Sequence, residues 1–129
     1  MLIKCHRIIS PATKEDLGEK SPWLQKNKEY VVLALNISNK FGIQACIQTE
    51  HHNEPACFDL DGFEVVSQHL PSNWITQVKE VDDQTIIEML PKNWAYQGFF
   101  EELENENLDS IAIFNKEAEL IYNEEKNIK

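Results

Sequence analysis

Four residues with metal-binding or nucleophilic side chains lie near the middle of the chain. Cys46, His51, His52 and Cys57 form the pattern C-x4-H-H-x4-C, and two thiolates with two imidazoles are a ligand set that suits Zn²⁺. The spacing is unfavourable, because short-loop zinc sites separate paired ligands by about two to five residues and adjacent histidines rarely face one metal. We therefore expect a solvated His-His loop, two packed cysteines, and neither a metal nor a cofactor.

The same cluster offers a Cys–His pair for nucleophilic catalysis, from Cys57 or Cys46 with His52 or His69. A catalytic thiol is usually activated by a cationic neighbour or a helix N-terminus. Here the neighbours are acids, which favour the neutral thiol: Glu50, Glu54, Asp59, Asp61 and Glu64. We expect no enzymatic activity, and a small metal- or thiol-dependent hydrolase built on Cys46, His51, His52 and Cys57 stays as the alternative.

Other catalytic and phosphate-binding motifs are absent from the sequence. GxSxG, HExxH, P-loop and GxGxxG patterns do not occur, and the chain has only four glycines. Asp59-x-Asp61-Gly62 is similar to the opening of a calcium loop but lacks the acid that such a loop has at its twelfth position. We expect a turn stabilised by aspartate side chains.

The densest charge in the sequence is the run Glu101-Glu102-Leu103-Glu104-Asn105-Glu106. Apolar residues at i, i+3, i+4 and i+7 predict an amphipathic helix over 94–104, with these acids toward its C-terminal end. Acids there oppose the helix macrodipole by about 0.3–1 kcal/mol each. Two interpretations stay open: the acids form a surface for a basic partner, or they precede the next helix and favour its N-terminus.

Trp94 and the pair Phe99-Phe100 are close to these acids in the sequence. Aromatic rings beside carboxylates suit an interface with an Arg- or Lys-rich partner. A domain of this size also needs its bulky side chains in the core, so core packing is the alternative for each ring. The next densest acidic group, Asp59, Asp61 and Glu64, is expected on a loop and strand edge, where binding residues are often carried.

Strand-type alternation dominates the first 90 residues and helix-type periodicity dominates the rest. Residues 28–38 give the clearest strand, with apolar residues on both faces, so we place it inside a sheet. Hairpins are expected over 28–50 and 74–90, and we expect no internal repeat. The sequence predicts one α+β domain over residues 1–129. Its antiparallel sheet of about five to six strands lies mainly within 2–90, and two C-terminal α-helices, mainly within 93–126, pack on that sheet.

The 129-residue chain carries 22 acidic and 12 basic side chains, for a formal net charge of −10. Such a surface repels phosphate backbones and attracts basic proteins. No apolar run approaches the roughly 20 residues of a membrane-spanning helix, and the first residues do not resemble a secretory signal. Three scattered cysteines favour reduced thiols. We expect a cytoplasmic protein that binds neither nucleic acid nor membrane.

Several short segments resemble a group of small bacterial proteins, the immunity proteins of contact-dependent growth inhibition and related polymorphic toxin systems. The likeness spans roughly residues 22–116. The segments that carry it are Pro22-Trp23-Leu24, Lys28-Glu29-Tyr30-Val31-Val32-Leu33, Phe63-Glu64-Val65-Val66-Ser67, Leu70-Pro71-Ser72-Asn73-Trp74, Pro91-Lys92-Asn93-Trp94 and Gly98-Phe99-Phe100-Glu101. The resemblance implies a cytoplasmic protein that binds one cognate toxin domain and blocks its active site or substrate path. Many such toxins are nucleases with basic clefts.

These observations lead to one expected function, a non-enzymatic inhibitor that binds a basic toxin nuclease, such as an RNase. An acidic nucleic-acid mimic that inhibits a host defence nuclease is a further alternative, which differs mainly in the partner. The sequence leaves the oligomeric state open. The residues expected to bind the partner are Glu101, Glu102, Glu104, Glu106, Asp59, Asp61, Glu64 and Trp94.

Overall fold

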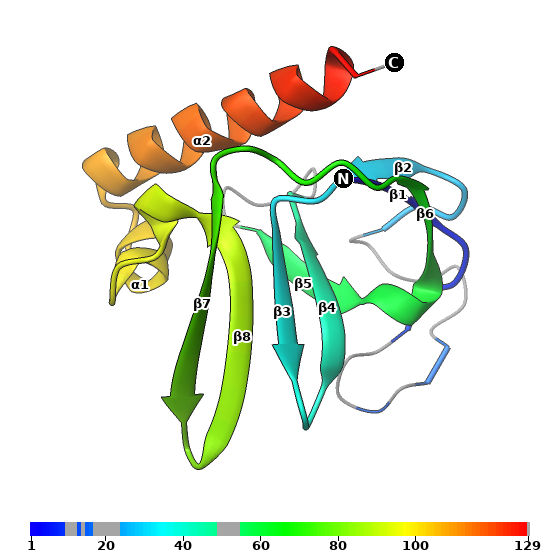
Figure 1. Ribbon diagram of the computed structural model, residues 1–129, viewed down its shortest axis with the longest axis horizontal. Coiled ribbons are helices and arrows are strands. Elements are labelled where there is room, and N and C mark those ends of the chain that lie inside the picture. Colours follow the sequence, from blue (N-terminus) through cyan, green and yellow to red (C-terminus); the bar gives the residue numbers. More distant parts are fainter. Residues whose placement is uncertain (10–12, 14, 17–23, 49–54, 129) are drawn as a thin grey trace.

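The structure is a computed structural model that describes residues 1–9, 13, 15–16, 24–48 and 55–128. Within these residues, eight strands form two antiparallel sheets, and two α-helices follow at the C-terminal end (Figure 1). The α+β class, the antiparallel pairing and the C-terminal helix pair are confirmed. The expected single sheet is instead two sheets.

The smaller sheet has three strands in the order β2-β1-β6, and the larger has five in the order β5-β4-β3-β8-β7. Both predicted hairpins are present, as β3–β4 and β7–β8. The strands are β1 (Leu2–Cys5), β2 (Glu29–Val31), β3 (Ala34–Ser38), β4 (Gly42–Ile47), β5 (Ala56–Asp59), β6 (Phe63–Ser67), β7 (Trp74–Val81) and β8 (Gln84–Pro91). The helices are the 3₁₀ turns η1 (Leu60–Gly62) and η2 (Lys92–Trp94), then α1 (Phe99–Glu104) and α2 (Leu108–Lys126).

The strand predicted over 28–38 is two strands in different sheets, so that prediction is wrong. β2 ends at Val31 and β3 begins at Ala34. Val32 and Leu33 between them are fully buried, Val32 in the first hydrophobic core and Leu33 in the second. Because both residues are apolar and buried, the sequence pattern does not show where the chain passes from one sheet to the other.

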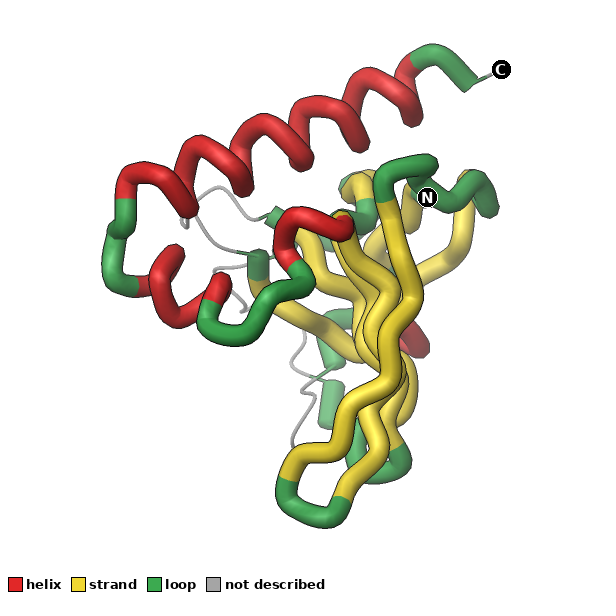
Figure 2. The backbone as a smooth tube through the Cα atoms, turned by 60° about the vertical axis from the view of Figure 1, so that its left-hand side comes forward, coloured by secondary structure: helices red, strands yellow, loops and turns green. Residues whose placement is uncertain are grey.

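The five-stranded sheet is the middle layer of the domain (Figures 1 and 2). Its two faces contribute to different cores, because side chains alternate along a strand. Leu35 and Ala45 pack into the core shared with the smaller sheet, whereas Ala34 and Leu90 pack into the core beneath the helices. In that second core Trp94 stacks on Phe114 of α2, with ring centroids 4.7 Å apart and an interplanar angle of 16°.

The first helix is shorter than the predicted span of 94–104. It begins at Phe99, because Gly98 has φ +89°, outside the helical region. Glu101 and Glu102 therefore lie in the first turn of α1 and not near its C-terminus. In the first turn of a helix, the macrodipole stabilises acidic side chains. The expectation that they oppose the dipole is wrong. Asn107 and Asp109 are residue types that predict a helix start in the sequence, and Asn107 is the cap of the next helix, since its side chain accepts a hydrogen bond from the Ser110 N–H at 3.1 Å.

A repeated pentapeptide joins the long helix to the β7–β8 hairpin. The pattern Leu-Pro-x-Asn-Trp occurs at 70–74 and again at 90–94, which corrects the expectation of no repeat. The Nδ2 groups of Asn73 and Asn93 both donate to the carboxyl group of Glu117, which is 5% exposed on α2. Asn73 lies at the start of the hairpin and Asn93 at its end, so one side chain of α2 holds both ends.

Replacing Glu117 with Ala should lower the thermal stability strongly. The change removes the charged acceptor of two hydrogen bonds, one from the half-buried Asn73 and one from the exposed Asn93, at about 1.5 kcal/mol each, so we expect the melting temperature to fall by about 10 °C. The matched control is Glu119→Ala, an exposed position on the same helix, which should change the free energy of unfolding by less than about 0.5 kcal/mol. Equal melting temperatures for the two variants would contradict the role of Glu117.

Glu124 of α2 holds the connection between β6 and β7. Its carboxylate accepts hydrogen bonds from the Ser72 N–H at 2.9 Å, from the Ser72 hydroxyl and from the His69 ring. The Ser72 side-chain hydrogen bond, with help from His69, lowers the pKa of Glu124 below its ordinary value. A carboxyl group with a lowered pKa in the folded state stabilises the protein above its unfolded pKa, and this contribution is lost as the pH falls through the folded pKa.

Glu124→Gln should therefore destabilise the protein in a pH-dependent way. At pH 7 we expect a melting temperature a few degrees below that of the wild type, because the ionised acceptor is lost. The difference should narrow below about pH 4, where the wild-type carboxyl group also takes up a proton. Thermal melts of both proteins from pH 3 to 7 measure this, and a constant difference across that range would argue against it.

Candidate functional site

A groove of about 710 Å³ lies between the β7–β8 hairpin and the segment that joins η2 to α1. We call it the hairpin groove. One wall is the segment from Trp94 to Glu101, and the other is formed by residues of the hairpin. The hairpin residues that line it are Gln77, Lys79, Glu80, Val81, Glu88 and Leu90.

Aromatic rings form the wall on the α1 side. Tyr96 and Phe100 are 44% and 37% exposed, and each packs edge-on against the buried Phe99, at centroid distances of 5.3 and 5.2 Å. Trp94 is only 1% exposed, and its buried Nε1 has no hydrogen-bond partner among the described residues. Trp94 is therefore mainly a core residue that supports the wall, while Tyr96 and Phe100 are the rings that a partner can reach.

The opposite wall is polar and includes a buried carboxylate. Glu88 is 7% exposed and accepts hydrogen bonds from Gln77 Nε2 at 3.1 Å and Lys79 Nζ at 2.9 Å. It belongs to a row of directly paired polar residues on one face of the sheet: Gln77, Glu88, Asn36, Gln44 and Asp59. Glu88 was not among the predicted residues. A lone acid in the run Thr85-Ile86-Ile87-Glu88-Met89-Leu90 is the signal that could have identified it.

The predicted acids after Phe100 fall into three kinds of environment. Glu101 is exposed and lines the hairpin groove. Glu102 accepts hydrogen bonds from the Tyr96 hydroxyl at 2.8 Å and the Ser110 hydroxyl at 2.9 Å, so it joins α1 to the start of α2. Glu104 and Glu106 are exposed but are not part of the groove.

The second predicted group does not form one surface with the first. Asp59 is buried and accepts a hydrogen bond from the Asp61 N–H at 3.0 Å, which confirms the expected aspartate turn. Asp61 is exposed, and Glu64 pairs with His6 at 3.0 Å on the smaller sheet. In Figure 1, α1 lies at the left of the molecule and β6 at the right. Asp59, Asp61 and Glu64 are therefore separate from the groove.

Cys46 and Cys57 form a disulfide, which corrects the expectation of reduced thiols. They face each other on the neighbouring strands β4 and β5. Neither sulfur is free to bind a metal or to act as a nucleophile while the bond is intact. Cys5 is the free cysteine and is buried, with its pKa raised chiefly by desolvation. His51 and His52 lie outside the described residues.

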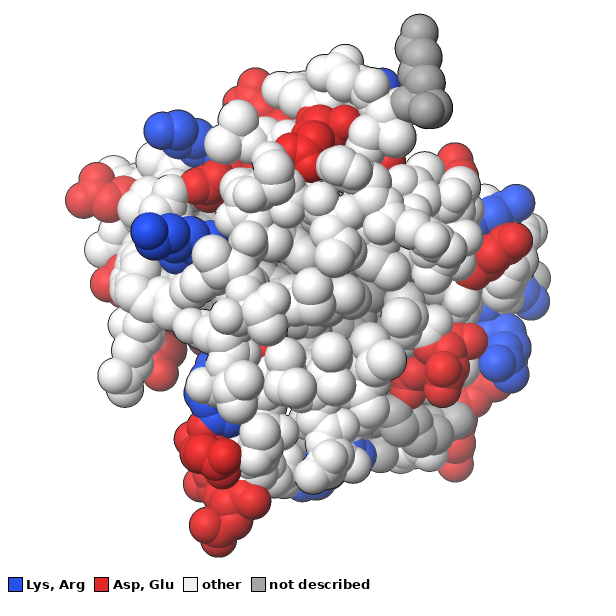
Figure 3. All heavy atoms as spheres, viewed as in Figure 1, with Lys and Arg blue, Asp and Glu red and all other residues white. Residues whose placement is uncertain are grey.

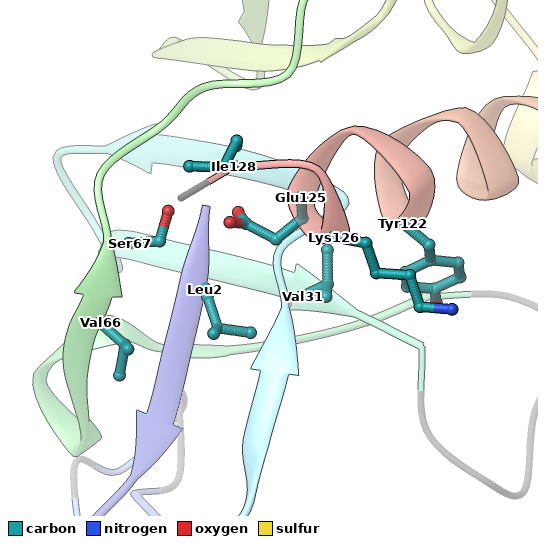
Figure 4. Close-up of a pocket in the computed structure, with 8 residues that line it drawn as sticks. All are labelled: Leu2, Val31, Val66, Ser67, Tyr122, Glu125, Lys126 and Ile128. Atoms are coloured by element: carbon teal, nitrogen blue, oxygen red, sulfur yellow. The ribbon is translucent and has the colours of Figure 1, made fainter.

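A second groove, of about 820 Å³, lies between the end of α2 and the smaller sheet (Figure 4). Leu2, Val31, Val66 and Ile128 make it mainly apolar. Tyr122 also lines it, and burial raises the pKa of that phenol. None of the predicted binding residues lies there, so the hairpin groove is the stronger candidate for a partner site.

Charge is concentrated at the tip of the β7–β8 hairpin. Figure 3 shows a red cluster at the position of this tip, at the lower left, whereas the middle of the same face carries no charged side chains. The turn is Asp82-Asp83, directly after Glu80 and Val81. The acidic tip and Glu80 thus adjoin the hairpin groove.

Comparison with known protein families, curated proteins and solved structures finds no match to this chain. In the part of the chain that the structure describes, no group of three or more His, Cys, Asp or Glu residues has the arrangement of a metal site. No helix in that part is long and apolar enough to cross a membrane.

Reduction of the Cys46–Cys57 disulfide should destabilise the protein. The two cysteines are separated by 11 positions in the sequence. A disulfide that closes a loop of this length stabilises the folded state by about 2–3 kcal/mol in the chain-entropy account. We expect a thiol reductant to lower the melting temperature of the wild type. Cys57→Ser should melt at the lower temperature with or without the reductant. A wild-type melting temperature that does not respond to reductant would exclude the disulfide.

Proposed function

We propose that this protein is an inhibitor that binds and neutralises a basic toxin domain, as the immunity protein of a polymorphic toxin system. The observation that carries the proposal is the hairpin groove, where the exposed rings of Tyr96 and Phe100 lie on the same wall as Glu101. Exposed aromatic residues next to carboxylates suit a partner that supplies Arg or Lys side chains. The formal net charge of −10 gives the same preference at long range.

In the proposed mechanism, charge and apolar contact act at different stages of binding. The acidic hairpin tip and Glu101 speed the encounter with a basic cleft, and the rings slow dissociation once water is excluded around them. A carboxylate held in a nuclease cleft occupies positions that substrate phosphates would take. The toxin is then inhibited because its substrate cannot enter, and no catalytic step by this protein is needed.

The proposal places the protein in the cytoplasm, where the toxin would act. Thiol reductants keep most cytoplasmic cysteines reduced, but neither Cys46 nor Cys57 lines the hairpin groove. Binding is therefore proposed to be independent of this disulfide. A Cys57→Ser variant that keeps its fold should protect cells as well as the wild type does.

Two neighbouring acids of α1 provide a matched test of the groove. Glu101 lines it and Glu104 does not, although both are exposed residues of one short helix. Against the cognate toxin domain that the proposal requires, Glu101→Gln should slow association at low salt and reduce its salt dependence. Glu104→Gln should have a smaller effect on both quantities.

Phe100→Ala extends the test to the aromatic wall. We expect the dissociation constant to rise about tenfold or more, mainly through faster dissociation. Association rates at two salt concentrations, dissociation rates and protection of growing cells measure these effects. Equal behaviour of the Glu101 and Glu104 variants, together with an unchanged Phe100→Ala variant, would remove the groove from the interface.

A further inference from the structure

β7 is a long edge strand of the larger sheet. Among the described residues, the order β5-β4-β3-β8-β7 leaves it paired on one side only, over the eight residues from Trp74 to Val81. Its register with β8 is continuous from Trp74↔Pro91 to Val81↔Gln84. An edge of this kind presents a row of backbone N–H and C=O groups to any extended chain that approaches it.

The turn and the register together show which backbone groups face outward. Asp82 and Asp83 have φ +50° and +64°, as in a two-residue type I′ turn. Such a turn is closed by a hydrogen-bonded pair, here Val81↔Gln84, and bonded and non-bonded pairs then alternate along the hairpin. The N–H and C=O groups of Thr76, Val78 and Glu80 therefore point away from β8. Pro91, which has no N–H, lies at a non-bonded pair, in agreement with this assignment.

The usual devices that protect a sheet edge are weak along β7. Proteins often protect an edge with a bulge, a proline or an outward lysine. β7 has neither a bulge nor a proline, and the ammonium group of Lys79 is bound to Glu88 on one face of the sheet at 2.9 Å. Val78, in the middle of the strand, is 63% exposed. The edge is therefore open at its centre.

The two faces of the sheet beside this edge differ in chemistry. Gln77 is paired with Glu88 on the face that lines the hairpin groove. Val78 lies on the opposite face and ends an apolar row, the directly paired residues Ile43, Ile37, Ile87 and Val78. A strand added next to β7 would place alternate side chains beside the acids of the groove and beside Val78.

We propose that an extended segment of the partner, with basic and apolar residues in alternation, pairs with β7 and enlarges the five-stranded sheet. This inference rests on the proposed function and specifies how the partner docks. A second copy of this chain is disfavoured as the occupant, because each copy carries a net charge of −10 and an Asp82-Asp83 turn at the end of this strand. The basic residues of the added strand face the hairpin groove, and its apolar residues extend the row that ends at Val78.

The test uses the full chain and an acetylated, amidated peptide of four Arg-Val repeats at low salt, with four Glu-Val repeats as the control peptide. Binding of the first peptide should slow amide hydrogen exchange at Thr76, Val78 and Glu80, measured by NMR. Val78→Pro removes an outward N–H without removing a bond to β8, and should weaken binding at least about tenfold. Val78→Ala keeps the N–H and should bind within about threefold of the wild type.

Three results would overturn the proposed strand pairing. They are no peptide binding by the wild type, equal binding of the two peptides, or equal peptide affinities for Val78→Pro and Val78→Ala. Binding that perturbs only residues 96–101 would also reject it and leave the proposed function standing, since the toxin measurements decide that question separately. A concentration-dependent dimer of the wild type that Val78→Pro abolishes would assign the edge to a second copy. If Val78→Pro does not fold, Glu80→Pro against Glu80→Ala repeats the comparison at the next outward position.

Discussion

The hydrogen bonds between Glu117 and the two asparagines, Asn73 and Asn93, fix the arrangement on which the candidate site depends. A buried carboxyl group needs partners, and those present here come from the two ends of the β7–β8 hairpin. The same contact places η2, and with it Trp94, against Phe114 of α2. The wall formed by Tyr96 and Phe100 is therefore held at a set distance from the hairpin, and the groove between them follows from this packing.

The middle layer of the domain gives the binding surfaces a rigid support. The five-stranded sheet has a core on each face near the helices and the smaller sheet. The β7–β8 and β3–β4 hairpins extend beyond both cores (Figure 1). They carry one polar row, which includes the buried Glu88, and one apolar row, which ends at the exposed Val78. A surface on paired strands needs little ordering on binding, which reduces the entropy cost of association.

The glutamates of this chain have different structural roles, although the sequence does not distinguish them. Glu102, Glu117 and Glu124 accept hydrogen bonds that join separate elements of the fold. Glu101, by contrast, is exposed and lines the hairpin groove. The total charge therefore overstates the number of carboxylates that are free to meet a partner. Long-range attraction of a basic protein depends on all of them, but close contact in the groove depends on few.

The sequence by itself determined the secondary-structure class, both hairpins, the capped second helix and the acidic surface. These features depend on local periodicity, turn residues and composition, which one chain segment carries alone. Only the tertiary structure decided that residues 28–38 serve two sheets, that Cys46 and Cys57 are bonded, and that Glu101 rather than Glu104 lines a groove. Each of these depends on contacts between segments far apart in the sequence, and an apolar or acidic residue carries no local signal of which distant neighbour it will meet.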